Sequence, residues 1–269
     1  MASGRFGLLI LHFIVLDLVQ KRHGEVPAIE DIRIFAQLFA LEPGVRLSEI
    51  LSMETFLPKR ITIALRHTDW WYWEDDMPIY IRSDFVDRCR FPDSVKEVRM
   101  ELETLERRKE QLDSIAEQMA SQWQFTRKDG IRLAVIPFAQ APPKVTRWTG
   151  TSAWNGERWI RDEARPGELD FYMLTVVWRV PKHDAELPDP PKKQSRIWAE
   201  SSTHKPMTGA VGLFRSLNMR EMKRIGVGLN TNAQEAVRLI TEARRTRATE
   251  LRAQRSDWTR RSRRLNPRP

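Results

Sequence analysis

The sequence predicts an α+β fold in which helices and strands are segregated along the chain. Through the first 130 residues, apolar side chains recur at the three- and four-residue spacing of amphipathic helices. From residue 131 to 181 the pattern changes to short strand-like runs separated by turn residues, among them Asn155-Gly156, which is typical of a two-residue hairpin. Helical spacing then returns, and Asn232 with Glu235 forms a capping-box pattern at the start of the basic helix that carries the arginine-rich tail.

These changes of pattern divide the chain into five expected segments. They are a helical domain (residues 1–91), a long central helix (92–130), a tryptophan-rich antiparallel β-meander (131–181), a proline-rich linker (182–198), and a helical region with a basic helical C-terminal tail (199–269). A length of 269 residues corresponds to about two domains. With 41% apolar residues and ten tryptophans, the chain can bury a substantial core.

The first segment is expected to hold four helices, over residues 6–22, 27–41, 47–53 and 58–67. The apolar run LLILHFIVL, at residues 8–16, has two interpretations. It can be a buried core helix or a targeting segment, although it is too short to span a bilayer as a helix. No membrane span is expected.

The run RLSEILSMETFLPKRITIALRHTDWWYW is followed by an acidic tip at residues 74–76 and two isoleucines at strand spacing. The pattern around this tip predicts a β-hairpin over residues 71–81. Residues 46–83 therefore resemble the winged-helix, or helix-turn-helix, domain of bacterial regulators. The resemblance implies that the helix beginning Leu-Pro-Lys enters the DNA major groove, with Pro58, Lys59, Arg60 and Thr62 facing DNA. A winged helix that contacts protein, or a different helical arrangement, is the alternative.

The clearest expected element is a helix that begins at Ser94, where Ser94 and Glu97 form a capping-box pair, and ends near Gly130. Its apolar residues fall close to a heptad seam. Such a helix could form a homodimeric coiled coil through residues 94–129, or half of an intramolecular helical hairpin.

In the meander, strand alternation places Trp148, Trp154 and Trp159 on one face of the sheet. Aromatic side chains on a sheet can stack unpaired bases, but more often they form the core beneath a helix. We expect the core role here.

The last 32 residues hold nearly all of the net charge. They contain eleven arginines and three acids, which gives +8 of the chain's +9. Such a block repels itself, so a polyanion is its natural partner, and the planar guanidinium suits phosphate. The alternatives are contact with an acidic protein or membrane surface, and a solvated face or localisation signal. The candidate phosphate-binding residues are Arg238, Arg244, Arg245, Arg247, Arg252, Arg255, Arg260, Arg261, Arg263 and Arg264.

Other chemistry has weaker signals. Cys89 lies between two arginines but is expected to be buried, and the acids at residues 74–76 are expected to form a solvated tip. The sequence has no zinc-ligand spacing and no glycine-rich nucleotide-binding motif. No cofactor or metal is therefore expected.

Together these patterns predict a non-enzymatic, intracellular protein that binds nucleic acid, either DNA or RNA. The arginine tail would supply phosphate contacts, and Lys59, Arg60 and Thr62 would supply any sequence preference. The alternative is a structural or assembly protein, viral or ribonucleoprotein, whose basic tail packs nucleic acid. A third class is an enzyme whose site forms only in three dimensions.

Overall fold

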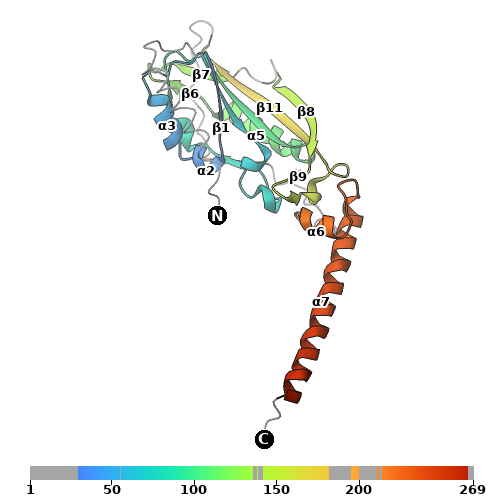
Figure 1. Cartoon of the computed structure of the whole chain (residues 1–269). Helices are drawn as coiled ribbons and strands as arrows, with labels where there is room; N and C mark the ends of the chain where they lie inside the picture. The colour runs from blue at the N-terminus through green and yellow to red at the C-terminus, as the bar shows by residue number, and fades with distance from the viewer. Residues whose placement is uncertain are drawn as a thin grey trace, which may run out of the picture. The chain divides into compact units, whose positions relative to one another are not determined.

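The computed structural model describes residues 30–54, 56–135, 138, 142–181, 195–199, 211 and 214–265, with only the backbone described at 257 and 259–265 (Figure 1). The helix expected at residues 6–22 lies outside these residues, as does most of the expected linker. The chain forms two compact units. Unit 1 comprises residues 1–148 and 171–205, and unit 2 comprises residues 149–170 and 206–269.

A mixed sheet of eight strands organises unit 1. The first three strands in spatial order are parallel to one another, and the fourth is antiparallel to both of its neighbours on the main path. In that order the strands are β1 (Asp31–Phe35), β2 (Arg60–Leu65), β5 (Glu97–Leu105), β11 (Glu168–Arg179), β7 (Arg132–Val135), β6 (Phe125–Arg127) and β4 (Arg90–Phe91), while β8 (Lys144–Thr151) also pairs with β11.

Strand β5 replaces the first part of the expected long helix. Residues 97–103 alternate between charged and apolar, and Val98, Met100 and Leu102 are fully buried in the core. The period of two is the strand period, and it coexists here with the helical spacing of the same leucines and valines. Hydrogen-bonded pairing with β2 and β11 favours the strand over the helix for these residues.

Strand β2 occupies the position of the expected recognition helix. Ile61 and Ile63 are fully buried, and five of the six residues of the strand are buried, as expected for a parallel strand covered on both faces. The helix expected at 58–67 is therefore wrong. The helix expected at 27–41 is also largely wrong, because β1 and the short helix α2 (Leu38–Leu41) occupy that range. The helix expected at 47–53 is confirmed as α3 (Val45–Ser52).

The expected hairpin of residues 71–81 is also absent. The chain forms short 3₁₀ turns, η1 (His67–Asp69) and η2 (Trp73–Asp75), before strand β3 (Tyr80–Arg82). Strand β3 pairs with β12 (Arg196–Trp198), which lies at the end of the expected linker. Helix α4 (Asp84–Arg88) and turn η3 (Glu106–Arg108) complete the connections of unit 1.

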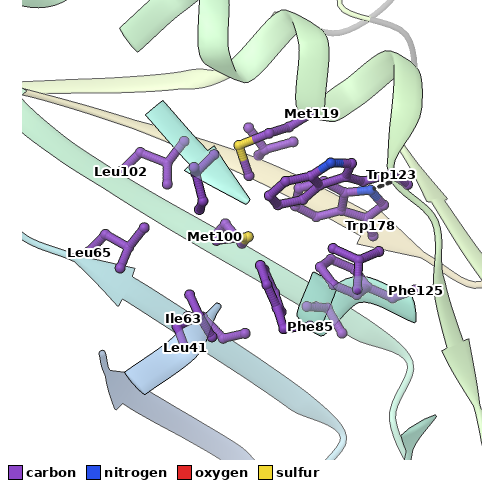
Figure 2. Close-up of a cluster of buried hydrophobic side chains, with 14 of the residues drawn as sticks. Leu41, Ile63, Leu65, Phe85, Met100, Leu102, Met119, Trp123, Phe125 and Trp178 are labelled. Carbon is purple, nitrogen blue, oxygen red and sulfur yellow. Dashed lines mark hydrogen bonds between the residues drawn. The ribbon is translucent and has the colours of Figure 1, made fainter. Parts of the chain in front are cut away.

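Helix α5 (Lys109–Gln122) packs its apolar stripe on the core of unit 1. Leu112, Ile115 and Met119 are fully buried. Figure 2 shows Met119 and Trp123 lying over the strands that carry Met100 and Trp178. The indole N–H of Trp178 donates to the carbonyl oxygen of Trp123 at 2.9 Å, so the core buries this polar group with a partner.

Unit 2 has its own small core. Strands β9 (Ala153–Trp154), β10 (Glu157–Arg158) and β13 (Leu217–Asn218) form a three-stranded sheet, accompanied by turn η4 (Ile160–Asp162) and helices α6 (Met219–Arg224) and α7 (Ala233–Leu265). The Asn155-Gly156 hairpin is confirmed, because Trp154 pairs with Glu157 and both turn residues have positive φ.

The expected architecture is therefore wrong in its main features: there is no helical N-terminal domain in the described residues and no long central helix. The meander strands β7, β8 and β11 join the N-terminal strands in one sheet. The expected dimer through residues 94–129 loses its basis, because β5 lies inside the sheet and the buried face of α5 is already covered by the core.

Candidate nucleic-acid interface

Helix α7 begins in the core of unit 2 and leaves it after about two turns. Asn232 caps its start, since the side-chain Oδ1 accepts the backbone N–H of Glu235 at 2.9 Å, as the capping pattern predicts. Ala236, Val237 and Ile240 are buried against Ile160, Leu217 and the neighbouring apolar residues of unit 2. This packing fixes the first part of the helix.

From Arg244 to Ser256 every residue of α7 is exposed, and so is Trp258. Over the residues whose side chains are described, the helix therefore continues for about four more turns without apolar burial. A helix that is polar on all sides gains no stability from packing and depends on charge pairs or on a partner. After Glu242 this helix has only two acids, Glu250 and Asp257.

Two of the predicted phosphate-binding arginines form ion pairs inside unit 2. Arg238 pairs with Glu235 and Glu242, at 2.6 and 2.8 Å, along its own helix. Arg244 pairs with Glu221 of α6 at 2.6 Å. The hydrogen bond from Arg244 holds the pKa of the Glu221 carboxyl below its ordinary value. These pairs are solvent-accessible, so phosphate could still compete for either arginine.

Arg245, Arg247 and Arg252 have no ion pair with any acid whose side chain the structure describes. Arg245 and Arg252 are seven residues apart, which is two helical turns, so both lie on one face of α7. Arg255 is also exposed. Arg260, Arg261, Arg263 and Arg264 lie on the last turns of the same helix.

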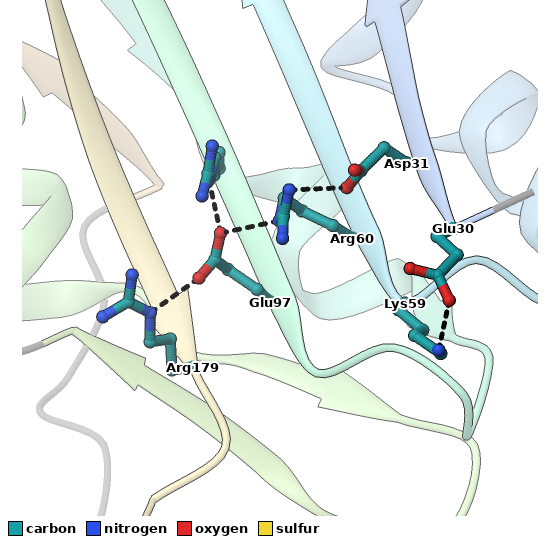
Figure 3. A network of polar contacts seen from close by, with 7 residues as sticks. Glu30, Asp31, Lys59, Arg60, Glu97 and Arg179 are labelled. Atoms are coloured by element: carbon teal, nitrogen blue, oxygen red, sulfur yellow. Dashed lines mark hydrogen bonds and ion pairs between the residues drawn. The ribbon is translucent and has the colours of Figure 1, made fainter.

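The residues expected to read DNA are arranged differently. Lys59 precedes β2 and pairs with Glu30, while Arg60 pairs with Asp31 at 2.8 Å and Glu97 at 3.2 Å (Figure 3). Thr62 lies within β2 and is buried, with only 7% of its surface exposed. No helix presents these three residues, so the expectation that they face the major groove from a recognition helix is wrong.

Glu97 is the centre of a charge network on this sheet. It accepts hydrogen bonds from Arg99 and from Arg179, the latter at 2.6 Å, besides its contact with Arg60. Burial acts to raise the pKa of the Glu97 carboxyl, but the hydrogen bonds from Arg179 and Arg99 outweigh it and hold the pKa below its ordinary value. Each arginine of this network is thus paired with an acid, although Arg60, Arg99 and Arg179 share only Glu97 and Asp31.

The tryptophans expected on one sheet face do not form an exposed platform. Trp178 is fully buried in unit 1 and Trp159 is buried in unit 2, where its ring stacks on Trp154 at 5.2 Å between centroids. Trp148 stacks on Phe171 at 5.4 Å. The expected core role is confirmed for Trp159, which is buried in unit 2.

Cys89 is buried, as expected, and its thiol lies 3.5 Å from the hydroxyl of Ser48. Burial raises the pKa of this thiol, so the flanking arginines do not activate it. Asp76, at the expected acidic tip, is buried and pairs with Arg107 at 2.6 Å, so the tip is only partly solvated. The described residues contain no cluster of three groups that could hold a metal ion.

Sequence reasoning missed two features of unit 2. Arg158 and Glu163 form a buried ion pair, for which their sequence gives no distinctive signal. Trp258 is 72% exposed on the arginine-rich helix. Its signal was available, because it is the only aromatic residue after Phe214 and lies between arginines.

Comparison with known proteins adds no relative: no family model, curated protein or solved structure matches the chain. Among the described residues, no helix combines the length and the apolar character needed to cross a bilayer.

Proposed function

We propose that the protein binds nucleic acid without catalysis, through phosphate contacts made by the exposed part of α7. The observation that carries the proposal is the continuous exposure of residues 244–256 on a helix in which arginines far outnumber acids. The helix from Arg244 to Leu265 is about 30 Å long at 1.5 Å per residue. It can therefore lie along roughly one turn of a duplex or a comparable length of single strand.

Charge and residue type favour phosphate over other anions. The tail uses arginine and no lysine, and the guanidinium fork binds two phosphate oxygens at once. Neutralisation of these charges by a polyanion removes the repulsion between neighbouring arginines along the helix. The cationic residues near the C-terminal end also suit the helix dipole, which supports a helical bound state.

This binding is expected to be independent of nucleotide sequence. The phosphate backbone is the same for every sequence, and contacts to it position a protein without reading bases. Lys59 precedes strand β2 and Arg60 lies on it, so no helix presents these two residues to base edges in a major groove. The affinity should therefore depend steeply on salt concentration.

The test compares two variants that remove the same charge from different places. Arg245→Gln/Arg252→Gln removes two positive charges from α7, and Lys59→Gln/Arg60→Gln removes two from unit 1. Binding of each to a labelled duplex is followed by fluorescence anisotropy between 50 and 200 mM KCl. Only the α7 variant should bind more weakly, with the slope of log affinity against log salt reduced by about 1.8 for two phosphate contacts.

Equal losses in the two variants would show that net charge alone matters. Absence of binding to duplex and to single-stranded RNA at micromolar concentrations would refute a nucleic-acid partner. Thermal unfolding of both variants checks that the fold is retained.

A structural or assembly role is the second candidate function. It is favoured by the loss of the expected base-reading helix, because the body of the protein is then available for protein contacts while α7 anchors nucleic acid. Under this role, a long nucleic acid should drive assembly of the full chain into large particles. Sedimentation with a 12-nucleotide and a 200-nucleotide RNA separates the candidates, since a simple binder coats the long RNA without forming such particles.

A further inference from the structure

Trp258 is an apolar residue in an unusual position. Among the described residues it is the most exposed large apolar side chain, at 72%, and it lies about five turns beyond Ile240, which with Val237 anchors α7 in its core. An indole is costly to leave in water, and exposed tryptophans are enriched where a partner covers them. Because Trp258 lies within the arginine tail, we expect the molecule that covers it to be the same one that the arginines bind.

The residues around Trp258 are hydrogen-bonding residues. Helix geometry places positions three and four residues away on the same face. Gln254 and Arg255 occupy those positions before Trp258, and the helix places an arginine at 261 and a serine at 262 after it. An indole with an amide and a guanidinium on the preceding turn of its face matches a nucleotide, which has a flat apolar face, polar edges and an adjacent phosphate.

We propose that Trp258 is a base-stacking site for single-stranded nucleic acid, and that it makes α7 prefer single strands to duplex. This inference rests on the proposed function and specifies its substrate class. In a duplex the bases are already stacked on each other, and inserting an indole between them costs a few kcal/mol. In a single strand the base faces are accessible, so each stacking contact adds affinity to the phosphate contacts.

Other occupants fit the same face less well. A second copy of α7 would bring two tails of the same charge together, and positions 247 and 261 on this face are arginines in both copies. A lipid surface or an apolar protein groove would be matched by a continuous apolar stripe. Here Leu251, one heptad earlier, is the one apolar neighbour of Trp258 with a described side chain on this face.

The test uses the full chain with three single substitutions. Trp258→Leu keeps an apolar side chain but removes the aromatic face, Trp258→Phe keeps a smaller aromatic face, and Leu251→Ala removes the apolar neighbour. The probes are a labelled 12-nucleotide oligouridylate and a labelled duplex of 12 base pairs, at one salt concentration. The Trp258→Leu variant should bind oligouridylate about 5- to 100-fold more weakly, with duplex affinity unchanged.

The two other variants are controls for stacking. Trp258→Phe should retain most of the oligouridylate affinity, and Leu251→Ala should retain all of it. The inference is overturned if Trp258→Leu has no effect on oligouridylate, or weakens both probes equally. It is also overturned if Leu251→Ala matches the loss in Trp258→Leu, because a general apolar contact then accounts for binding.

Failure of the proposed function gives a different result. In that case the unsubstituted chain binds neither probe at micromolar concentrations. Vesicles containing phosphatidylserine then test the lipid alternative directly: binding that is lost in both Leu251→Ala and Trp258→Leu would assign the face to a membrane surface and overturn the stacking site.

Discussion

Arg158 and Glu163 form a two-pronged ion pair in which both side chains are almost wholly buried, with 0% and 2% of their surface exposed. Nε of Arg158 donates to Oε1 of Glu163 and Nη2 donates to Oε2, each at 2.7 Å. The same guanidinium donates to the carbonyl oxygens of Gly228, at 3.2 Å, and Thr231, at 2.6 Å. Strand β10 is thereby tied to the segment that leads into α7.

Substitution of Arg158 by methionine should destabilise unit 2 by about 3–5 kcal/mol, because Glu163 is left buried without its counter-charge. The carbonyl groups of Gly228 and Thr231 also lose their donor. Urea unfolding followed by tryptophan fluorescence measures the change. The control is Arg165→Met, which removes an exposed arginine that pairs with Glu168 and should leave the midpoint nearly unchanged. Similar losses in both variants would contradict a special role for burial.

The two parts of α7 should contribute very differently to stability. Ile240→Ala should cost about 2–5 kcal/mol, since the side chain is fully buried in the core of unit 2. Leu251→Ala, on the same helix, should change stability by less than about 0.5 kcal/mol, since that side chain is 50% exposed. Thermal or urea unfolding in the absence of nucleic acid checks both values. A large cost for Leu251→Ala would mean that the distal helix packs on another surface.

Local signals in the sequence predicted local structure well. Asn155-Gly156 indicated the hairpin and Asn232 indicated the start of α7, because a turn or a cap depends on a few neighbouring residues. Residues 97–105 were misassigned because glutamate, arginine and leucine have high helix propensity. The alternation of charged and apolar residues from 97 to 103 was the better indicator, although pairing with β2 and β11 is what stabilises the strand.

The candidate interface was predictable in part. The excess of arginine in the tail is a property of composition, so it can be recognised without knowledge of the fold. The pairing of Arg244 with Glu221 joins residues 23 apart, and the exposure of Trp258 depends on where the core of unit 2 ends. Neither follows from local sequence. Lys59 and Arg60 were misassigned because their acidic partners, Glu30, Asp31 and Glu97, are brought close by the parallel pairing of strands.

Glu97 should make the protein more stable as pH rises from acid. Its pKa is lowered in the folded state, so its contribution is fully present above the ordinary value of 4.5 and is lost as pH falls through the folded pKa. Glu97→Gln cannot titrate, so its deficit in unfolding free energy relative to the unsubstituted chain should be largest at pH 7 and should shrink below pH 4.5. Urea unfolding at pH 7, 5 and 3.5 measures this. A deficit in unfolding free energy that stays constant with pH would show that the ionised Glu97 carboxylate does not stabilise the fold.

Glu42 should show the opposite pH dependence. Its carboxylate is almost fully buried, where it accepts hydrogen bonds from the indole N–H of Trp71 and the backbone N–H of Arg82, each at 2.9 Å. Burial raises the pKa of this carboxyl above its ordinary value, and the two hydrogen bonds offset only part of the effect. The protonated form is therefore favoured by folding.

The contribution of Glu42 is thus fully present below the ordinary value of 4.5 and is lost as pH rises through the folded pKa. Glu42→Gln should lose the most unfolding free energy, relative to the unsubstituted chain, at low pH, and the deficit should narrow as pH rises towards neutrality. The same urea series used for Glu97→Gln measures it. If the two variants show deficits that change in the same direction with pH, burial does not control the charge of Glu42, and its hydrogen bonds to Trp71 and Arg82 dominate instead.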